Sequence, residues 1–223
     1  MNAQETYDFL LSKSNLVYNT NKSFVETNVL KIPIPFNQKI LELDFGLFKN
    51  LNKVIINYSY KLFYKDCLEK IILKNAPKYI QKMGMIKSKK EISLVVEGSR
   101  VEGIQFEFAN IGEIFFNTPN IEYISLNHNN IKEFSCNSTT LEEIYLLANK
   151  ITKLNLKSKK IQVLDLRRNP LLQDVEIECQ NIHTIDASPY LKLKKKNDFF
   201  DILKSKGYEP QWIQNSEINK DLF

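Results

Sequence analysis

The sequence predicts a repeat solenoid of the α/β or mainly β class, in which successive turns of the chain stack along one axis. Two observations lead to this prediction. Apolar residues recur with a period of 20 residues between positions 101 and 187, and such self-similarity is the signature of a repeat architecture. Within each period, apolar residues also alternate with other residues, and an alternation of period two indicates extended strands.

Four stretches of the chain share one pattern without gaps. Apolar residues occupy positions 1, 4, 6 and 11 of each stretch, and Asn occupies position 9 in three of them. The stretches begin at Val101, Ile121, Leu141 and Ile161, and a fifth copy begins one residue late, at Ile182. The recurring asparagines are Asn129, Asn149 and Asn169, and Ala109 stands at this position in the first stretch.

The pattern LxxLxLxxNxL resembles the leucine-rich repeat family. The resemblance implies a right-handed solenoid with a parallel concave sheet, and a role as a binding module. It also implies that Asn129, Asn149 and Asn169 turn inward, where they hydrogen-bond backbone groups that a tight turn leaves unpaired. The chain contains no Leu-Pro pair, which distinguishes it from the best-known short bacterial repeats.

The second half of each repeat shows a further alternation of apolar residues. The alternating pairs are Ile114/Phe116, Phe134/Cys136, Leu154/Leu156 and Val175/Ile177. A period of 20 residues leaves no room for a full helix in this half. We therefore expect extended segments on the convex side, opposite the parallel sheet.

The chain is expected to form one continuous domain with a cap at each end, because the end turn of a solenoid exposes its core. Residues 3–13 form an amphipathic pattern, and Asp198 is placed to N-cap a helix that ends before Gly207. Tyr208, Trp212 and Ile213 would complete the second cap. The expected organisation is an N-terminal cap over 1–28, divergent repeats over 29–100, regular repeats over 101–190 and a C-terminal helical cap over 191–223.

The divergent repeats keep the apolar pattern at irregular spacing. Segments that match the first, sheet-forming half of a repeat begin near residues 29, 40, 51, 68 and 80, and Leu94/Val96 match a second half. We expect a helical turn around Tyr60–Lys70, between two of these segments.

Positions 2, 3, 5, 7 and 8 of each repeat are expected to decorate the concave face. They carry seven acids and two bases, a net charge near −5. Such a face repels phosphates and attracts a basic protein surface, so we expect a protein partner and no nucleic acid on this face. Tyr and Arg are enriched at binding hot spots. The predicted contact residues are Tyr123, Glu142, Glu143, Tyr145, Leu147, Asp165, Arg167 and Arg168.

Two other functions stay open at this stage. The protein could be a scaffold that assembles through its caps or sheet edges, with the tyrosines as ordinary strand residues. It could also bind an anionic membrane or nucleic acid weakly through lysine-rich turns. These lysines are Lys87, Lys89 and Lys90, then Lys157, Lys159 and Lys160, and finally Lys192, Lys194, Lys195 and Lys196.

The sequence contains no pattern typical of an enzyme, so we expect a non-catalytic protein without metal or cofactor. None of the common nucleotide-binding, zinc-protease or nucleophile-elbow motifs occurs. His128 and His183 fall three repeats apart, which corresponds to roughly 14 Å at the spacing of stacked strands. Cys136 occupies an inward position and is expected in the core.

Composition favours an ordered protein of a reducing compartment. Hydrophobic residues make up 43% of the chain and charged residues 26%, which excludes disordered and fibrous classes. No apolar run approaches the ~20 residues of a membrane span, and the N-terminus lacks the pattern of a secretory signal. The three cysteines show no CxxC spacing. We expect a cytoplasmic monomer, and export by a specialised secretion system stays open.

Overall fold

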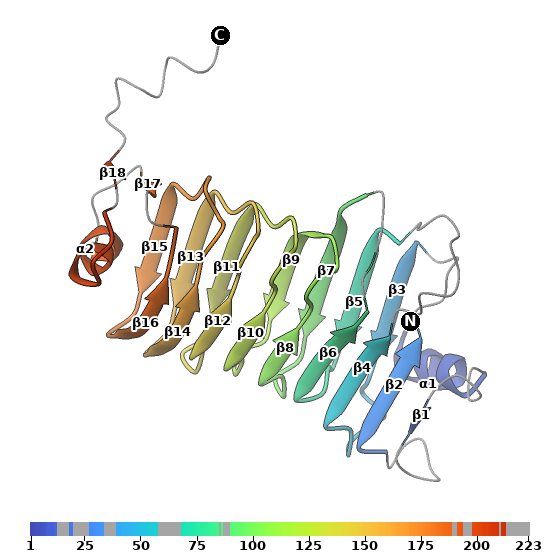
Figure 1. Ribbon diagram of the computed structural model, residues 1–223. Helices are drawn as coiled ribbons and strands as arrows, with labels where there is room; N and C mark the ends of the chain where they lie inside the picture. The colour runs from blue at the N-terminus through green and yellow to red at the C-terminus, as the bar shows by residue number, and fades with distance from the viewer. Residues whose placement is uncertain are drawn as a thin grey trace.

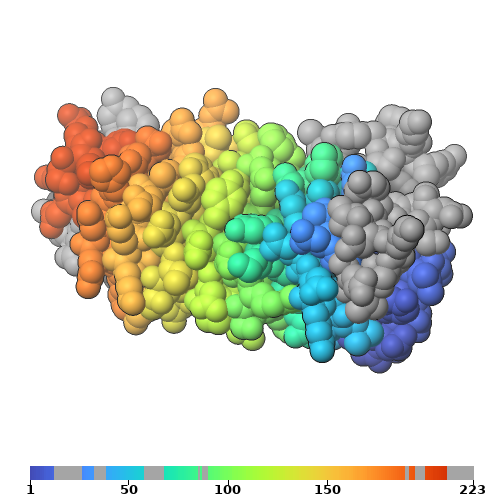
Figure 2. Space-filling model, turned by 90° about the horizontal axis from the view of Figure 1, so that it is seen from below, coloured from blue at the N-terminus to red at the C-terminus, as the bar shows by residue number. Residues whose placement is uncertain are grey.

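In the computed structural model, the chain winds into a solenoid of parallel strands (Figure 1). The structure describes residues 1–12, 18–19, 27–33, 39–57, 68–84, 86, 90–188, 191–193, 198–209 and 211–212. The chain progresses along the long axis without doubling back, so each turn packs against the turns before and after it (Figure 2). The prediction of a mainly β repeat solenoid is confirmed at this level.

One face of the solenoid is a single sheet that we call the long sheet. All its strands run parallel except β1, which pairs with β2 in the antiparallel direction. Within the described residues its strands, in spatial order, are β1 Tyr18–Asn19, β2 Val29–Pro33, β4 Lys53–Asn57, β6 Tyr79–Met83, β8 Gly103–Gln105, β10 Tyr123–Ser125, β12 Glu143–Tyr145, β14 Ile161–Asp165 and β16 Ile182–Asp186.

The opposite face consists of two shorter parallel sheets. The first back sheet contains β3 Ile40–Asp44, β5 Lys70–Lys74, β7 Ile92–Glu97 and β9 Ile111–Asn117. The second back sheet contains β11 Glu133–Asn137, β13 Lys153–Lys157 and β15 Asp174–Glu178. The expected extended segments on this side are therefore strands, but no ladder joins β9 to β11 in the described structure.

Two segments lie on the opposite face from the one predicted. The segments beginning near residues 40 and 68 form β3 and β5 of the first back sheet, not strands of the long sheet. Both halves of a turn show the same alternation of buried and outward residues, so the local pattern alone does not identify the face.

The register of the long sheet explains the irregular spacing in the divergent repeats. Val29, Lys53, Tyr79 and Gly103 align at intervals of 24 to 26 residues, whereas later turns align at 20 or 21. The expected helical turn at Tyr60–Lys70 lies mostly outside the described residues, and Lys70 itself begins β5.

The core is one continuous apolar column, enclosed between the long sheet and the back sheets. At its first end, helix α1 (Ala3–Ser12) buries Leu10, and the Thr6 hydroxyl accepts a hydrogen bond from the Asp44 amide at 2.8 Å. Asn2 and Glu5 cap this helix reciprocally, with side-chain to backbone hydrogen bonds of 2.9 and 2.8 Å. The predicted N-terminal helix is confirmed.

The other end of the column is covered by helix α2 (Asp198–Ser205), which buries Phe199 and Leu203. Gly207 follows with a φ of +83°, the left-handed conformation that favours glycine after a helix. The Tyr208 hydroxyl donates to the Ile185 carbonyl at 3.0 Å and ties the cap to the last turn. Two short strands, β17 (Lys192–Leu193) and β18 (Gln211–Trp212), pair beside it, and Ile213 lies outside the described residues.

The asparagines at the ninth position connect successive turns. The Asn149 amide donates to the carbonyls of Leu126 and Leu146, each at 3.0 Å, and its oxygen accepts from the Ile131 amide at 3.2 Å. Asn129 and Asn169 repeat the carbonyl contacts in their own turns. Each side chain is buried, so it satisfies backbone groups that water does not reach.

Neither helix is long and apolar enough to cross a bilayer, as far as the described residues show.

Candidate functional site

The outer face of the long sheet carries a row of tyrosine rings. Tyr123 on β10 and Tyr145 on β12 are diagonal neighbours, with ring centroids 5.8 Å apart and planes inclined by 49°. Tyr79 aligns with Tyr123 two strands away, on the other side of Gly103. We call Tyr79, Tyr123 and Tyr145 the tyrosine strip. Burial raises the pKa values of Tyr123 and Tyr145 above their ordinary value.

Gly103 lies between Tyr79 and Tyr123 in the strip. A Cβ atom at this position would lie 3.0 Å from Cδ1 of Tyr79, so the ring of Tyr79 leans over the glycine. A shallow hollow of about 280 Å³ remains beside it, lined by Gln81, Gln105 and Tyr123 among others. The two glutamine side chains hydrogen-bond each other at 3.0 Å.

Four of the seven carboxylates on this face already accept hydrogen bonds from neighbouring side chains. Glu102 lies 2.7 Å from the Lys78 ammonium and accepts from the Tyr79 hydroxyl at 3.2 Å, and the Lys78 contact lowers its pKa. Glu107 accepts hydrogen bonds from Ser125 and Asn127. Because the Lys78 ammonium compensates Glu102, counting only the charges of the face overstates its negative charge by one.

Asp165 is the third engaged acid. Its side chain is only 4% exposed, and the Arg167 guanidinium binds it with two nitrogens at 3.0 and 2.7 Å. This pairing raises the pKa of Arg167 further above its ordinary value. Asp165 is therefore a structural partner of Arg167, and a ligand would meet the arginine first.

The remaining acidity is centred on β10 and β12. Glu122 and Glu142 are exposed, and neither forms an ion pair within the described part of the chain. Glu143 is half-buried and accepts from the Tyr145 hydroxyl at 3.1 Å. These carboxylates flank the tyrosine strip.

Three predicted contact residues lie just beyond the ends of β12 and β14. Leu147, Arg167 and Arg168 line a separate hollow of about 470 Å³, together with Ala187 and Ser188. The structure thus divides the predicted patch into the tyrosine strip with its glutamates and an arginine-lined edge. Phe108 and His128 stack at the same end of their strands, with centroids 4.3 Å apart.

Sequence reasoning missed Tyr79, the most exposed ring of the strip. Its turn follows the irregular spacing of the divergent repeats, so its position in the register was not evident. Its place directly before the buried Ile80, which aligns with Ile104, was the available signal.

The described residues contain no group of three potential metal ligands. Burial raises the pKa of the Cys136 thiol to about 12, so this cysteine is an inert part of the core. Cys67 lies outside the described residues.

Comparison with protein-family models, with curated proteins and with solved structures finds no match to this chain.

Proposed function

We propose that this chain is a solenoid of the leucine-rich repeat type that binds another protein, without catalysis, on the outer face of its long sheet. The observation that carries the proposal is the tyrosine strip, in which the rings of Tyr123 and Tyr145 adjoin and Tyr79 lies in the same row. The exposed carboxylates of Glu122 and Glu142 border it.

The strip has the physical character of a binding surface. Tyrosine offers a large apolar ring and a polar hydroxyl with few rotatable bonds, so little side-chain entropy is lost when it is covered. The strands beneath are held on both sides by ladders, which makes the surface preformed and lowers the entropic cost of association.

The charge pattern favours a partner with basic groups. Glu122 and Glu142 are uncompensated and exposed beside the rings, where Lys or Arg side chains can pair with the carboxylates and stack on the tyrosines. The same charges repel a phosphate backbone.

Contact through the lysine-rich turns receives less support. Lys90 lies 2.8 Å from Glu69 and Lys157 lies 2.8 Å from Glu178, so these lysines are compensated within the protein. Lys87, Lys89 and Lys194 to Lys196 lie outside the described residues.

A capture experiment with matched variants tests the proposal. The test variant combines Tyr145→Ala with Glu142→Lys, and the control combines Leu171→Ala with Asp201→Lys, an equivalent loss and charge reversal at exposed residues away from the strip. Proteins held by the wild type and the control should be lost with the test variant. Equal capture by both variants, with both folded, would contradict the proposal.

A further inference from the structure

The tyrosine strip contains a hollow between two groups of aromatic rings. Gly103 on β8 aligns with Tyr79 on one side and with Tyr123 on the other, and it carries no side chain. The hollow of about 280 Å³ lies here, and both tyrosines belong to its lining. Beyond it, the rings of Tyr123 and Tyr145 adjoin. The outer face thus presents one ring, a hollow over a single strand, and then a pair of rings.

Charge changes sign along the row that contains the hollow. Across the strands from β4 to β12, the aligned residues are Lys53, Tyr79, Gly103, Tyr123 and Glu143. Lys53 also lines the hollow, so it repels a cationic group from the β4 end. Glu143 and the exposed Glu142 beside it attract a cationic group to the β12 end. A ligand with one basic end would therefore bind in a single direction.

The spacing of these features matches one turn of a polyproline II helix. Neighbouring strands lie about 4.8 Å apart, so β8 and β12, two strands apart in the long sheet, are separated by about 9.6 Å. A polyproline II helix has three residues per turn and rises about 3.1 Å per residue, so residues i and i+3 lie on one side about 9.3 Å apart. The corresponding repeats are about 6.7 Å for an extended strand and about 5.4 Å for an α-helix, which match the strand spacing less well.

The hollow also offers hydrogen-bond donors to a polyproline II backbone. The Gln81 side-chain amide donates to the Gln105 side-chain oxygen at 3.0 Å, and both residues line the hollow. Each of these amide groups carries two N–H hydrogens, and this bond uses only one of them. A polyproline II backbone forms no internal hydrogen bonds, so its carbonyls are free to accept from such donors. Proline-rich segments dock in grooves lined by aromatic rings for the same reason that they are preformed and lose little entropy.

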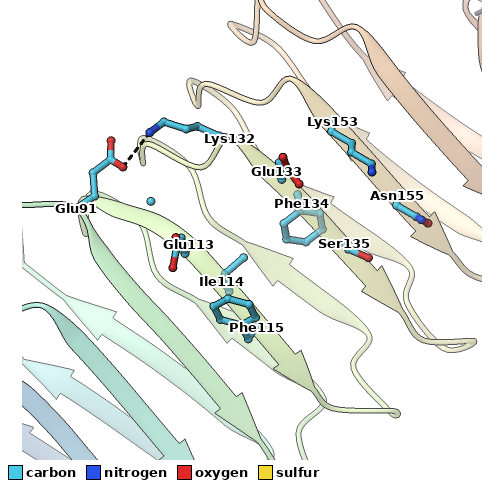
Figure 3. Close-up of a pocket in the computed structure, with 11 residues that line it drawn as sticks. Glu91, Glu113, Ile114, Phe115, Lys132, Glu133, Phe134, Ser135, Lys153 and Asn155 are labelled. Carbon is cyan, nitrogen blue, oxygen red and sulfur yellow. Dashed lines mark hydrogen bonds and ion pairs between the residues drawn. The ribbon is translucent and has the colours of Figure 1, made fainter.

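A groove on the back of the solenoid, by contrast, is bridged by its own side chains. It has a volume of about 500 Å³ and lies between β11 and β9, where the register with β7 shifts at Gly112 and forms a bulge. The Lys132 ammonium lies 3.4 Å from the Glu91 carboxylate across this groove (Figure 3). The rings of Phe116 and Phe134 contact each other, with centroids 6.1 Å apart. Its lining therefore selects no particular occupant, unlike the hollow beside the tyrosines.

We propose that the tyrosine strip binds a proline-rich segment of the partner protein in the polyproline II conformation, with one proline over Gly103 and an Arg or Lys three residues later. This inference rests on the proposed function and specifies the segment that the partner presents. The proline packs between the tyrosines that line the hollow, and the cation pairs with Glu142 and Glu143. The segment runs across the strands from β8 toward β12, because the reverse orientation would bring its cation to Lys53 on β4.

A short peptide tests the inference before the partner is identified. The probe is a fluorescent peptide of sequence Ala-Pro-Pro-Ala-Pro-Arg-Ala with blocked ends, in which a proline precedes the arginine by three residues. It should bind the protein saturably in fluorescence anisotropy. A second peptide with glutamate in place of arginine, and a third with glycine in place of every proline, should each bind about tenfold more weakly. The second peptide is repelled by the carboxylates, and the third loses both the proline rings and the preformed helix.

Variants of the protein locate the bound probe. Gly103→Leu fills the hollow and Glu142→Lys reverses a charge at its far end, so each should weaken binding of the arginine peptide about tenfold. Leu171→Ala, at an exposed residue away from the strip, should leave the affinity unchanged. Thermal unfolding checks that each variant is folded. If Gly103→Leu does not fold, Tyr79→Ala removes one wall of the hollow without adding bulk and should weaken binding equally.

The outcomes separate this inference from the proposed function. Binding that depends on proline, on arginine and on an open hollow supports the inference. No binding to the folded wild type, equal binding of the glycine peptide, or unchanged affinity of the folded Gly103→Leu variant would each overturn it. If the capture experiment still shows proteins that are lost with Tyr145→Ala and Glu142→Lys, the proposed function holds while the proline-rich segment is refuted.

Discussion

Lys82 hydrogen-bonds the turn in which Ala109 stands in place of the asparagine at the ninth position of the repeat. From the preceding turn, the Lys82 ammonium donates to the carbonyls of Glu107 and Phe108, the latter at 3.0 Å. In later turns, the ninth-position asparagine donates to the equivalent carbonyl. The Asn129 side-chain amide, for example, donates to the Asn127 carbonyl at 3.3 Å. Lys82 in one turn therefore supplies the hydrogen-bond donor that the repeat pattern would supply from an asparagine in the following turn.

The pH dependence of stability should report the burial of Lys82. Desolvation lowers its pKa from 10.5 to about 8, although Glu107 opposes the shift. Below about pH 8 both the folded and the unfolded states carry the charge, and burying it destabilises the fold. Between about 8 and 10.5 only the unfolded state retains the proton, so the free energy of unfolding should rise with pH. Lys82→Met should show a flatter profile in urea titrations across this range, and identical profiles would contradict the assignment.

Removal of one of the asparagines at the ninth position should destabilise the protein strongly. Asn149→Ala removes the partner of the buried Ile131 amide. The carbonyls of Leu126 and Leu146 each lose one of two donors and keep Asn129 and Asn169 respectively. One unsatisfied buried group costs about 1–3 kcal/mol, so we expect a loss of about 2 kcal/mol in urea unfolding. Asn155→Ala, at an exposed position of β13, should change stability by less than about 0.5 kcal/mol. A similar small effect for both variants would show that the hydrogen bonds of Asn149 contribute little to stability.

The two described cysteines should differ in reactivity. Cys136 is buried with its thiol pKa raised to about 12, whereas Cys179 is partly exposed. Because the thiolate is the reactive species, iodoacetamide at pH 8 should modify Cys179 and leave Cys136 intact until denaturant is added. Peptide mass spectrometry separates the sites, and early labelling of Cys136 in the folded protein would show that its turn opens.

A side chain at Gly112 should strain the bulge of β9. The Cβ of Gly112→Ala would meet the Glu91 carboxylate at 2.5 Å and its Cβ at 2.7 Å, so the strand or Glu91 must shift. Overpacking of this kind typically costs about 1–3 kcal/mol, measurable by thermal unfolding. Gly46→Ala, where the nearest atom would be 3.2 Å away, is the milder comparison. Equal melting temperatures for the two variants would show that Glu91 yields freely.

Repeat spacing made part of the fold predictable. The starts at Ile121, Leu141 and Ile161 specify the aligned strands β10, β12 and β14, because a fixed period places equivalent residues on equivalent points of each turn. The same argument fails at Ile40 and Leu68, where turns are longer and both halves carry the same alternation.

The candidate surface was only partly visible in the sequence. The column positions of Tyr123 and Tyr145 predict that both face outward, and the structure brings their rings into contact. Tyr79 lies in the same row because its longer turn aligns it with Gly103 in the neighbouring strand, and Gly103 in turn aligns with Tyr123. The pairing of Asp165 with Arg167 follows from side-chain geometry, which a count of charges does not contain.

By itself, the sequence determined the solenoid, the inward asparagines and the two capping helices, because these follow from periodicity and from local capping residues. The tertiary structure alone decided which half of each divergent turn joins the long sheet, where Lys82 finds its acceptors and where β9 parts from β11. Those outcomes depend on contacts between residues about 20 or more positions apart in the chain, and the register of neighbouring turns sets such contacts only when the whole array is assembled.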